Sequence, residues 1–275
     1  MPEGPEIRHI ADQLQQAIGD EDCVEISFAF EHLKVFEAEL TGQRVQGVTS
    51  QGKALLTRFS GGWTIYSHNQ LYGRWMVRKA YQYPDTSRQL RLAIHTRRKS
   101  ALLYSASDIE VIRTEEEHKH PFLKKLGPDV LDDSCRVEDV RKRLDLPEFR
   151  QKQLGTLLLD QGFLAGLGNY LRSEVLFLAG LQPHLKPRQC DPVQLNLLAQ
   201  ACVGVTRQSY RTNGITNDLK LAEALKQQGV PRAHFRHWVF ARAGRPCWKC
   251  QAPIERTSSG SRRLYFCPNC QRLPA

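Results

Sequence analysis

The 275-residue sequence lacks any apolar run long enough to cross a bilayer. A signal peptide is not apparent either, because Arg8, His9 and Asp12 interrupt the first apolar stretch. Internal repeats and low-complexity segments are also missing. These absences exclude a membrane-spanning protein. A hydrophobic share of 41% is enough to form the hydrophobic cores of one or two domains in a chain of this length. We therefore expect a soluble protein of the cytoplasm.

Acidic residues are almost absent from the C-terminal end. From residue 232 to 275, Glu255 is the single acid against nine Lys or Arg residues. This segment therefore supplies +8 of the formal net charge of +10. A segment of one sign that also carries aromatic residues is typical of a phosphate-binding surface. The expected partner is a polyanion, with nucleic acid favoured over an acidic membrane surface.

The chain begins Met1-Pro2-Glu3. We expect removal of Met1, because the next residue is small, and this would leave a secondary amine beside a carboxylic acid. An α-amino group has a pKa of about 8, so part of it is neutral and nucleophilic at neutral pH. Its attack on an electrophilic carbon would give an iminium ion, which accepts electrons strongly. The alternative is that Pro2 is incidental, and the Met-Pro start alone does not decide between them.

Hydrophobic periodicity predicts a helix over residues 5–18, followed by short strands with Gly-rich turns. The expected strands are residues 45–48, 54–59, 63–67, 75–77, 91–96 and 101–105. Their close spacing indicates a β-sandwich or barrel. A connector over residues 120–131 precedes a helical region, with expected helices at residues 138–144, 153–164, 170–178 and 193–208. The polar stretch 212–229 is expected to be a mobile loop.

Four cysteines near the C-terminus form the pattern C-x2-C-x16-C-x2-C. They are Cys247, Cys250, Cys267 and Cys270. Paired CxxC motifs at such a spacing are typical of tetrahedral thiolate binding of Zn²⁺. The segments 254–257 and 262–266 between them predict a β-hairpin that presents Arg262 and Arg263. All four ligand positions are filled by protein, so the metal would be structural and would order a hairpin too small to fold alone.

The other four cysteines occur singly. They are Cys23, Cys135, Cys190 and Cys202. In a reducing compartment we expect free thiols, most of them buried.

Three shorter motifs could contact DNA or its phosphates. Gly166-Leu167-Gly168-Asn169 lies between two expected helices, where glycines allow close approach of a phosphate and a helix N-terminus offers N–H groups. Lys53 follows a glycine turn and could reach a phosphate or move a proton. The tip His68–Gly73 could fill the gap that a displaced base leaves, with Leu71 as a wedge and Tyr72 stacking. The alternatives are an ordinary helix–helix turn, a solvated surface lysine, and a strand end packed into its own domain.

In this order along the chain, the motifs resemble the formamidopyrimidine-DNA glycosylase and endonuclease VIII family, and most closely its bacterial endonuclease VIII branch. The resemblance covers essentially the whole chain. It implies an α+β multidomain protein that starts with a β-sandwich with flanking helices. The implied divisions are the sandwich at residues 1–124, a linker at 125–132, a helical domain with a helix–two-turn–helix at 133–230, and an antiparallel zinc-finger hairpin at 237–272.

The resemblance also implies the chemical roles of three residues. Pro2 matches the Schiff-base nucleophile of the family, Glu3 its general acid, and Lys53 the proton donor in β-elimination. The zinc ion is the single expected cofactor, and it would take no part in the chemistry.

The DNA contacts are likewise implied by the resemblance. Asn169 matches the phosphate-binding asparagine, and Arg262 matches the zinc-finger arginine tied to phosphate binding and δ-elimination. Gln70 matches a DNA-contacting wedge residue, beside Leu71 and Tyr72. The sequence departs from the endonuclease VIII pattern at Lys125, which replaces an arginine before Gly-Pro-Asp. A lysine keeps the charge but loses the two-pronged guanidinium, so slightly weaker phosphate binding is expected.

The expected activity is that of a monomeric base-excision-repair enzyme acting on damaged double-stranded DNA. It would excise oxidised pyrimidines of the thymine glycol type and cut the strand by β,δ-elimination. The Gln70-Leu71-Tyr72 wedge favours this lesion class, because the oxidised-purine enzymes have a Met-containing equivalent, and no clear match to their capping loop precedes the finger. The first alternative is an 8-oxoguanine and formamidopyrimidine glycosylase. A non-catalytic zinc-finger DNA-binding protein is a second, and an RNA-binding regulator, supported by charge alone, is a third.

Overall fold

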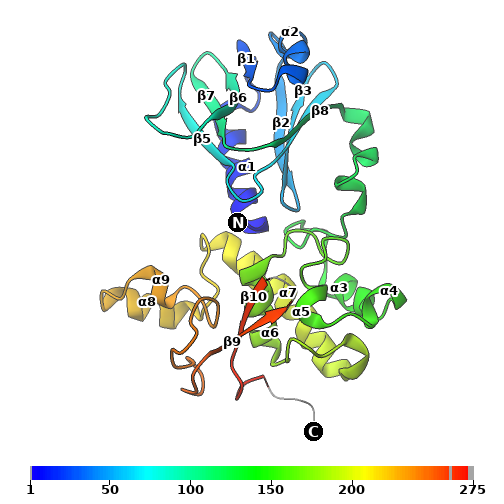
Figure 1. Ribbon diagram of the computed structural model, residues 1–275, viewed down its shortest axis with the longest axis vertical. Coiled ribbons are helices and arrows are strands. Elements are labelled where there is room, and N and C mark those ends of the chain that lie inside the picture. The colour runs from blue at the N-terminus through cyan, green and yellow to red at the C-terminus, as the bar shows by residue number, and fades with distance from the viewer. Residues whose placement is uncertain (1, 260–261, 272–275) are drawn as a thin grey trace. The chain divides into compact units, whose positions relative to one another are not determined.

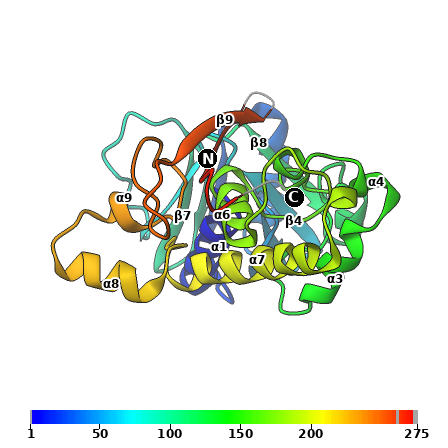
Figure 2. The same ribbon diagram turned by 90° about the horizontal axis from the view of Figure 1, so that it is seen from below.

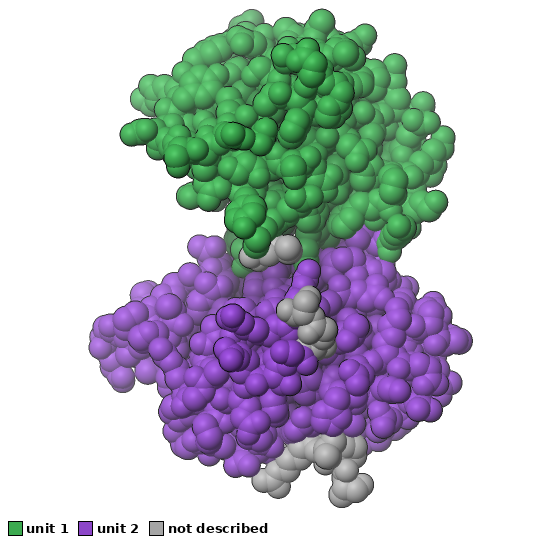
Figure 3. Space-filling model, in the orientation of Figure 1, with its two compact units in different colours: residues 1–2, 6–125 green, residues 3–5, 126–275 purple. Residues whose placement is uncertain are grey.

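The computed structural model describes residues 2–259 and 262–271, which form two compact units (Figure 1). Unit 1 contains Pro2 and Glu6–Lys125, whereas unit 2 contains Glu3–Pro5 and the described residues from Leu126 onwards (Figure 3). Among the described residues, no helix is both long and apolar enough to span a membrane.

Unit 1 is a sandwich of two antiparallel four-stranded sheets. One sheet has the order β1-β6-β7-β5 and the other β2-β3-β4-β8. The strands are β1 (Glu25–Phe28), β2 (Val45–Gln51), β3 (Ala54–Phe59), β4 (Trp63–His68), β5 (Arg74–Lys79), β6 (Leu90–His95), β7 (Lys99–Tyr104) and β8 (Asp108–Arg113). Short helices accompany them, namely η1 (Glu31–Phe36), α2 (Glu37–Leu40), η2 (Thr114–Lys119) and η3 (Leu123–Lys125). The structure is thus the sandwich, not the barrel, of the two alternatives.

The core of unit 1 lies between the two sheets and receives one face of helix α1 (Gly4–Ile18). Ile7, Leu14 and Ile18 of this helix are buried, as their spacing predicts. The six predicted strands are confirmed, and their ends either coincide with the prediction or shift by up to three residues. The strands β1 and β8 were not predicted, although β1 buries alternate residues and so carries the two-residue period.

Unit 2 is helical and carries a two-stranded antiparallel hairpin (Figure 2). Its helices are α3 (Val137–Leu144), α4 (Pro147–Arg150), α5 (Leu154–Leu157), α6 (Asn169–Ala179), η4 (Pro187–Gln189), α7 (Pro192–Arg211), α8 (Leu219–Gln227) and α9 (Arg232–Phe235). The hairpin consists of β9 (Glu255–Ser259) and β10 (Arg262–Phe266). Helix α6 packs on α7 with one side and on β10 with another, and its residues from Tyr170 to Phe177 are all buried.

Two predictions for unit 2 are wrong. The helix expected at residues 153–164 is only the single-turn α5 followed by turns. Its apolar residues are buried by tertiary packing. The Arg143 side chain donates hydrogen bonds to the carbonyls of Gly162 and Phe163, which therefore do not bind helical N–H groups. The stretch 212–229, expected as a mobile loop, contains the helix α8, which Asp218 caps by accepting a hydrogen bond from the Leu221 N–H.

The observed sandwich, helical unit and hairpin confirm the predicted α+β class. The predicted domain limits at residues 124, 132, 230 and 237 remain a prediction.

Candidate active site

The carboxylate of Glu3 is fixed at the N-terminus of helix α6. Its Oε1 accepts from the Tyr170 N–H at 2.7 Å and its Oε2 from the Leu171 N–H at 3.2 Å. These N–H groups belong to the first turn of the helix, where backbone donors have no partner within the helix and favour an anion. Only 3% of Glu3 is exposed. Because a peptide bond joins Pro2 to Glu3, the helix fixes a carboxylate directly beside the predicted nucleophile.

The glycines of the turn before α6 make room for this arrangement. A Cβ atom at Gly168 would lie 2.4 Å from Cδ of Glu3, so any other residue would displace the carboxylate. Gly166 has a φ of +91°, and its carbonyl accepts from the Gly4 N–H at 2.8 Å. The Gly-Leu-Gly-Asn motif is therefore more than an ordinary turn, since it docks the start of the chain onto unit 2.

Asn169 is the first residue of α6, and Arg262 is exposed at the start of β10. The Oδ1 atom of Asn169 accepts from Nη2 of Arg172 at 2.9 Å. The hairpin is tied to the same helix, because the Tyr265 N–H donates to Oγ of Ser173 at 3.3 Å. Unit 2 thus gathers Glu3, Asn169 and the strand of Arg262 around the first turns of one helix.

The four C-terminal cysteines form a cluster that could hold a metal ion. The ligand atoms of Cys247, Cys250, Cys267 and Cys270 all lie within 4.8 Å of one another. The Sγ atoms of Cys250 and Cys267 are 3.4 Å apart, and those of Cys247 and Cys270 are 3.8 Å apart. Tetrahedral zinc–sulfur bonds of about 2.3 Å require sulfur atoms roughly 3.8 Å apart, so the donor set fits such a site. The hairpin β9–β10 lies between the two cysteine pairs, as predicted.

Lys53 lies in the two-residue turn between β2 and β3, where Gln51 pairs with Ala54. Only 7% of this lysine is exposed, which is unusual for a charged residue at a hairpin tip and argues against a solvated surface charge. Ala54 pairs with His68, so the lysine stands beside the end of β4. The positive charge of Lys53 helps to lower the pKa of His68, although burial is the larger cause and Asp108 opposes both.

The predicted wedge is an ordered tip that follows β4. The Gly73 N–H donates to the Asn69 carbonyl at 2.7 Å and closes the turn. Gln70 has a φ of +48° and is held on two sides, by Nδ1 of His68, which accepts from its N–H at 3.0 Å, and by Oγ of Ser107, which donates to its Oε1 at 2.9 Å. Leu71 and Tyr72 are 55% and 68% exposed. Two large apolar side chains on a fixed turn are suited to insertion between bases.

Comparisons with known proteins identify the relatives of this chain. The Formamidopyrimidine-DNA glycosylase N-terminal domain matches residues 1–107, and the Formamidopyrimidine-DNA glycosylase H2TH domain matches residues 126–220. Endonuclease 8 of Klebsiella pneumoniae subsp. pneumoniae is 48% identical over 271 residues, which are 98% of this chain and 100% of that protein. Endonuclease 8 of Salmonella enteritidis is 48% identical over 272 residues, with 99% and 100% covered.

The chain belongs to the formamidopyrimidine-DNA glycosylase and endonuclease VIII family. Members of this family are DNA N-glycosylases with abasic-site lyase activity, so this protein is an enzyme of base excision repair. Family membership argues against the non-catalytic DNA-binding protein and the RNA-binding regulator.

Solved structures of the family share the fold. Lactococcus lactis formamido-pyrimidine DNA glycosylase, bound non-covalently to DNA with an AP site, aligns with a TM-score of 0.80 at 22% identity, covering 98% of this chain and 99% of that one. The same enzyme in complex with DNA that contains an oxidized pyrimidine aligns with a TM-score of 0.81 at 22% identity, covering 98% and 100%. Both solved structures are complexes of that enzyme with DNA.

Lys125 is exposed at the end of η3 in unit 1, and its backbone N–H donates to the Phe122 carbonyl. Its role in DNA binding remains a prediction from the family pattern.

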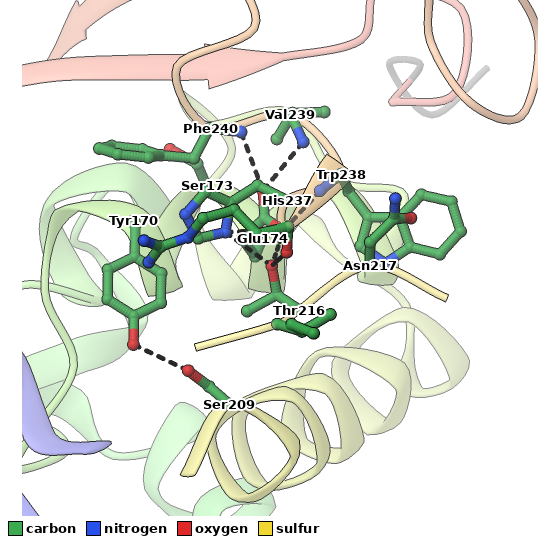
Figure 4. Close-up of polar contacts among 12 residues, drawn as sticks. Tyr170, Ser173, Glu174, Ser209, Thr216, Asn217, His237, Trp238, Val239 and Phe240 are labelled. Atoms are coloured by element: carbon green, nitrogen blue, oxygen red, sulfur yellow. Dashed lines mark hydrogen bonds and ion pairs between the residues drawn. The ribbon is translucent and has the colours of Figure 1, made fainter. Parts of the chain in front are cut away.

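Sequence reasoning missed the buried Glu174 of α6 (Figure 4). Its carboxylate accepts from the N–H groups of Trp238, Val239 and Phe240 at 2.8–2.9 Å, and from the Thr216 hydroxyl. Burial raises the pKa of Glu174, and these hydrogen bonds oppose that shift. The sequence gives only a weak signal for it, a charge in a helix of mainly apolar residues, with no distinctive spacing. Glu174 joins the helix of Asn169 to the segment that leads into the cysteine cluster.

Proposed function

We propose that this enzyme excises oxidised pyrimidines from duplex DNA and cuts the strand through a Schiff base on Pro2. The observation that carries the proposal is the Glu3 carboxylate, which two backbone N–H groups of α6 hold one peptide bond away from Pro2. An amine and an acid in this covalent relationship can share the work of attack and proton transfer. The 48% identity to Endonuclease 8 over the full chain supports the lesion class.

The proposed reaction begins after Met1 is removed. The Pro2 nitrogen attacks C1′ of a flipped-out nucleotide, Glu3 donates a proton as the sugar ring opens, and the C1′–base bond breaks. The resulting iminium ion acidifies the C2′ hydrogen. Loss of that proton breaks the C3′–O bond, and a second elimination breaks the C5′–O bond. Water then hydrolyses the imine and leaves a one-nucleotide gap flanked by phosphates.

Other residues take supporting roles in this proposal. Lys53 supplies a proton during β-elimination, and its burial at the hairpin tip is consistent with a role beyond surface charge. Asn169 and Arg262 bind phosphate, and Arg262 assists δ-elimination. Gln70, Leu71 and Tyr72 fill the space that the flipped nucleotide leaves. The four cysteines would hold one Zn²⁺, which orders the hairpin that carries Arg262.

The nucleophile is tested by borohydride trapping on duplex DNA with an abasic site. We expect a covalent adduct whose mass places the reduced deoxyribose on the N-terminal peptide at Pro2. The variant Pro2→Gly should trap far more slowly, whereas Pro5→Ala changes a proline that never carries a terminal amine and should trap normally. An adduct mapped to Lys53 or any other lysine would overturn the proposal, as would an active enzyme that retains Met1.

The lesion class is tested by parallel incision of duplexes that carry thymine glycol or 8-oxoguanine. We expect faster cutting of thymine glycol. Faster cutting of 8-oxoguanine would instead establish the alternative substrate class. Trapping at Pro2 does not distinguish the two classes, because both use the same nucleophile.

A further inference from the structure

Arg172 is a fully buried arginine in the first turn of α6, next to the predicted phosphate-binding residues. Its Nη1 donates to the Gly155 carbonyl at 2.7 Å, and its Nη2 donates to Oδ1 of Asn169 at 2.9 Å. The same Nη2 also donates to the carbonyls of Arg262 and Arg263 at 3.2 and 3.1 Å. All four acceptors are uncharged oxygen atoms. A buried guanidinium bound to neutral acceptors is costly, so its location calls for a functional explanation.

The contact with Asn169 determines which end of the side-chain amide is available to a ligand. A guanidinium has only donors, so it requires the carbonyl end of the amide as its partner. With Oδ1 turned towards Arg172, the NH₂ group is left to point elsewhere. The opposite orientation would set donors against donors. A phosphate has only acceptors, so Arg172 selects the orientation of Asn169 that can bind one.

The contacts with β10 place the predicted phosphate-binding arginine on the same helix. The carbonyls of Arg262 and Arg263 belong to the first two residues of the strand, where the hairpin returns from its tip. The side chain of Arg262 is exposed while its main chain is fixed. One guanidinium therefore joins Asn169 and Arg262, which are 93 positions apart in the sequence.

The local charges are consistent with an anion site. The pKa of Arg172 is lowered to about 10, mainly by burial and also by the charge of Arg262, while Glu3 opposes both effects. Arg172 therefore stays protonated at neutral pH. The two positive charges of Arg172 and Arg262 attract a phosphate group.

We propose that Arg172 is a positioning residue for DNA phosphate binding, which fixes the amide of Asn169 and the strand of Arg262 so that both are presented together. This inference rests on the proposed roles of Asn169 and Arg262. It adds a residue that contacts neither the substrate nor the reacting atoms.

The test is a double-mutant cycle on binding to a duplex that contains a tetrahydrofuran abasic analogue, which cannot be cleaved. Arg172→Met should weaken binding about tenfold, as expected for the loss of one to two well-oriented hydrogen bonds. The same change made in an Asn169→Ala background should cost at least threefold less, because the amide it orients is gone. Coupling of this kind would not arise from a general loss of stability.

Arg207→Met is the matched control. Arg207 also donates to main-chain carbonyls in unit 2, those of Val130, Asp132 and Cys135, but it contacts no predicted phosphate ligand. Its loss should lower the melting temperature and leave DNA affinity within about twofold of the wild type. If Arg172→Met does not fold, Arg172→Lys keeps the charge without the forked donor, and the same coupling to Asn169→Ala is expected with a smaller loss.

Equal losses from Arg172→Met in the wild-type and Asn169→Ala backgrounds would overturn the positioning role alone. If Asn169→Ala binds as tightly as the wild type, the assigned role of Asn169 and this inference both fail. Trapping at Pro2 is measured separately and is unaffected by either outcome.

Discussion

At the scale of single residues, the predicted site is marked by charged groups in unusual places. Glu3 and Lys53 are almost fully buried, although glutamate and lysine are usually solvated. Their motifs could be recognised in the sequence because each stands beside a glycine or proline that shapes the backbone. Arg172 and Glu174 could not, because a charge in a helix of mainly apolar residues has no distinctive spacing. Each of the two also has a partner more than 40 positions away, which no local pattern shows.

The hydrogen bond between His68 and Gln70 predicts a pH dependence of the tip. Nδ1 of His68 accepts from the Gln70 N–H only while that nitrogen carries no proton. Burial is the main cause that lowers the pKa of His68, Lys53 adds to it, and Asp108 opposes it. The ring is therefore neutral at neutral pH. The midpoint of protonation, and with it the loss of the bond, must lie below the ordinary pKa of 6.5.

The measurement compares incision of duplex DNA by the wild type and by His68→Asn. An asparagine can accept from the N–H two residues ahead through its side-chain oxygen and does not titrate. We expect similar rates near pH 7.5, and a wild-type rate that falls roughly fivefold relative to the variant as the pH drops well below 6.5, the equivalent of one hydrogen bond. A constant ratio of the two rates across this range would show that His68 does not hold the tip.

At the scale of elements, helix α6 is the common support of unit 2, and Glu174 connects it to residues 238–240 (Figure 4). Glu174→Gln would replace one carboxylate oxygen by an NH₂ group. That group would face the Trp238 N–H and the Thr216 hydroxyl, or the N–H groups of Val239 and Phe240 if the amide turned over. Donors would then lack acceptors, so we expect the free energy of unfolding to fall by about 2–4 kcal/mol.

Urea unfolding of Glu174→Gln at neutral pH measures this loss. The control is Glu223→Gln on α8, whose carboxylate is exposed and contacts the exposed side chains of Lys226 and Gln227. It should change the free energy of unfolding by no more than about 0.5 kcal/mol. If both variants change the free energy of unfolding by the same amount, Glu174 does not stabilise the connection between α6 and residues 238–240.

Most elements could be predicted from the sequence, and the failures have physical reasons. The helix α1 and six strands of the sandwich have regular periods and clear turn residues. The helix predicted at residues 153–164 does not form along its whole length, because its leucines are buried by neighbouring segments. In addition, the N–H groups of Leu154 and Gly155 donate to the carbonyls of Leu185 and Pro183. Such long-range backbone bonds leave no trace in local periodicity.

The helix α8 was missed for a different reason, because its signals were present. Asp218 is a favourable N-cap, and Leu221, Ala222 and Leu225 have the spacing of one helix face. The polar composition of residues 212–229 concealed this pattern. Composition is thus a weaker guide than capping and spacing for short surface helices.

At the scale of the whole molecule, each unit has its own hydrophobic core, and the cysteine cluster has a third, smaller one. That small core contains Phe177, Val239, Cys247, Ile254, Tyr265 and Cys267. It is too small to stabilise the hairpin β9–β10 without further constraint, which a bound metal would supply. Metal removal should therefore affect unit 2 and leave unit 1 intact.

Hydrogen exchange with and without a strong chelator tests this expectation. Loss of the metal should expose the amides of residues 247–259 and 262–271, while amides of the sandwich strands β3, β6 and β7 keep their protection. DNA binding should weaken together with the hairpin, because Arg262 loses its fixed strand even though Arg172 and Ser173 still offer their contacts. If the hairpin stayed protected after the metal had been removed, those contacts with α6 would be sufficient, and the metal would not be what orders the hairpin.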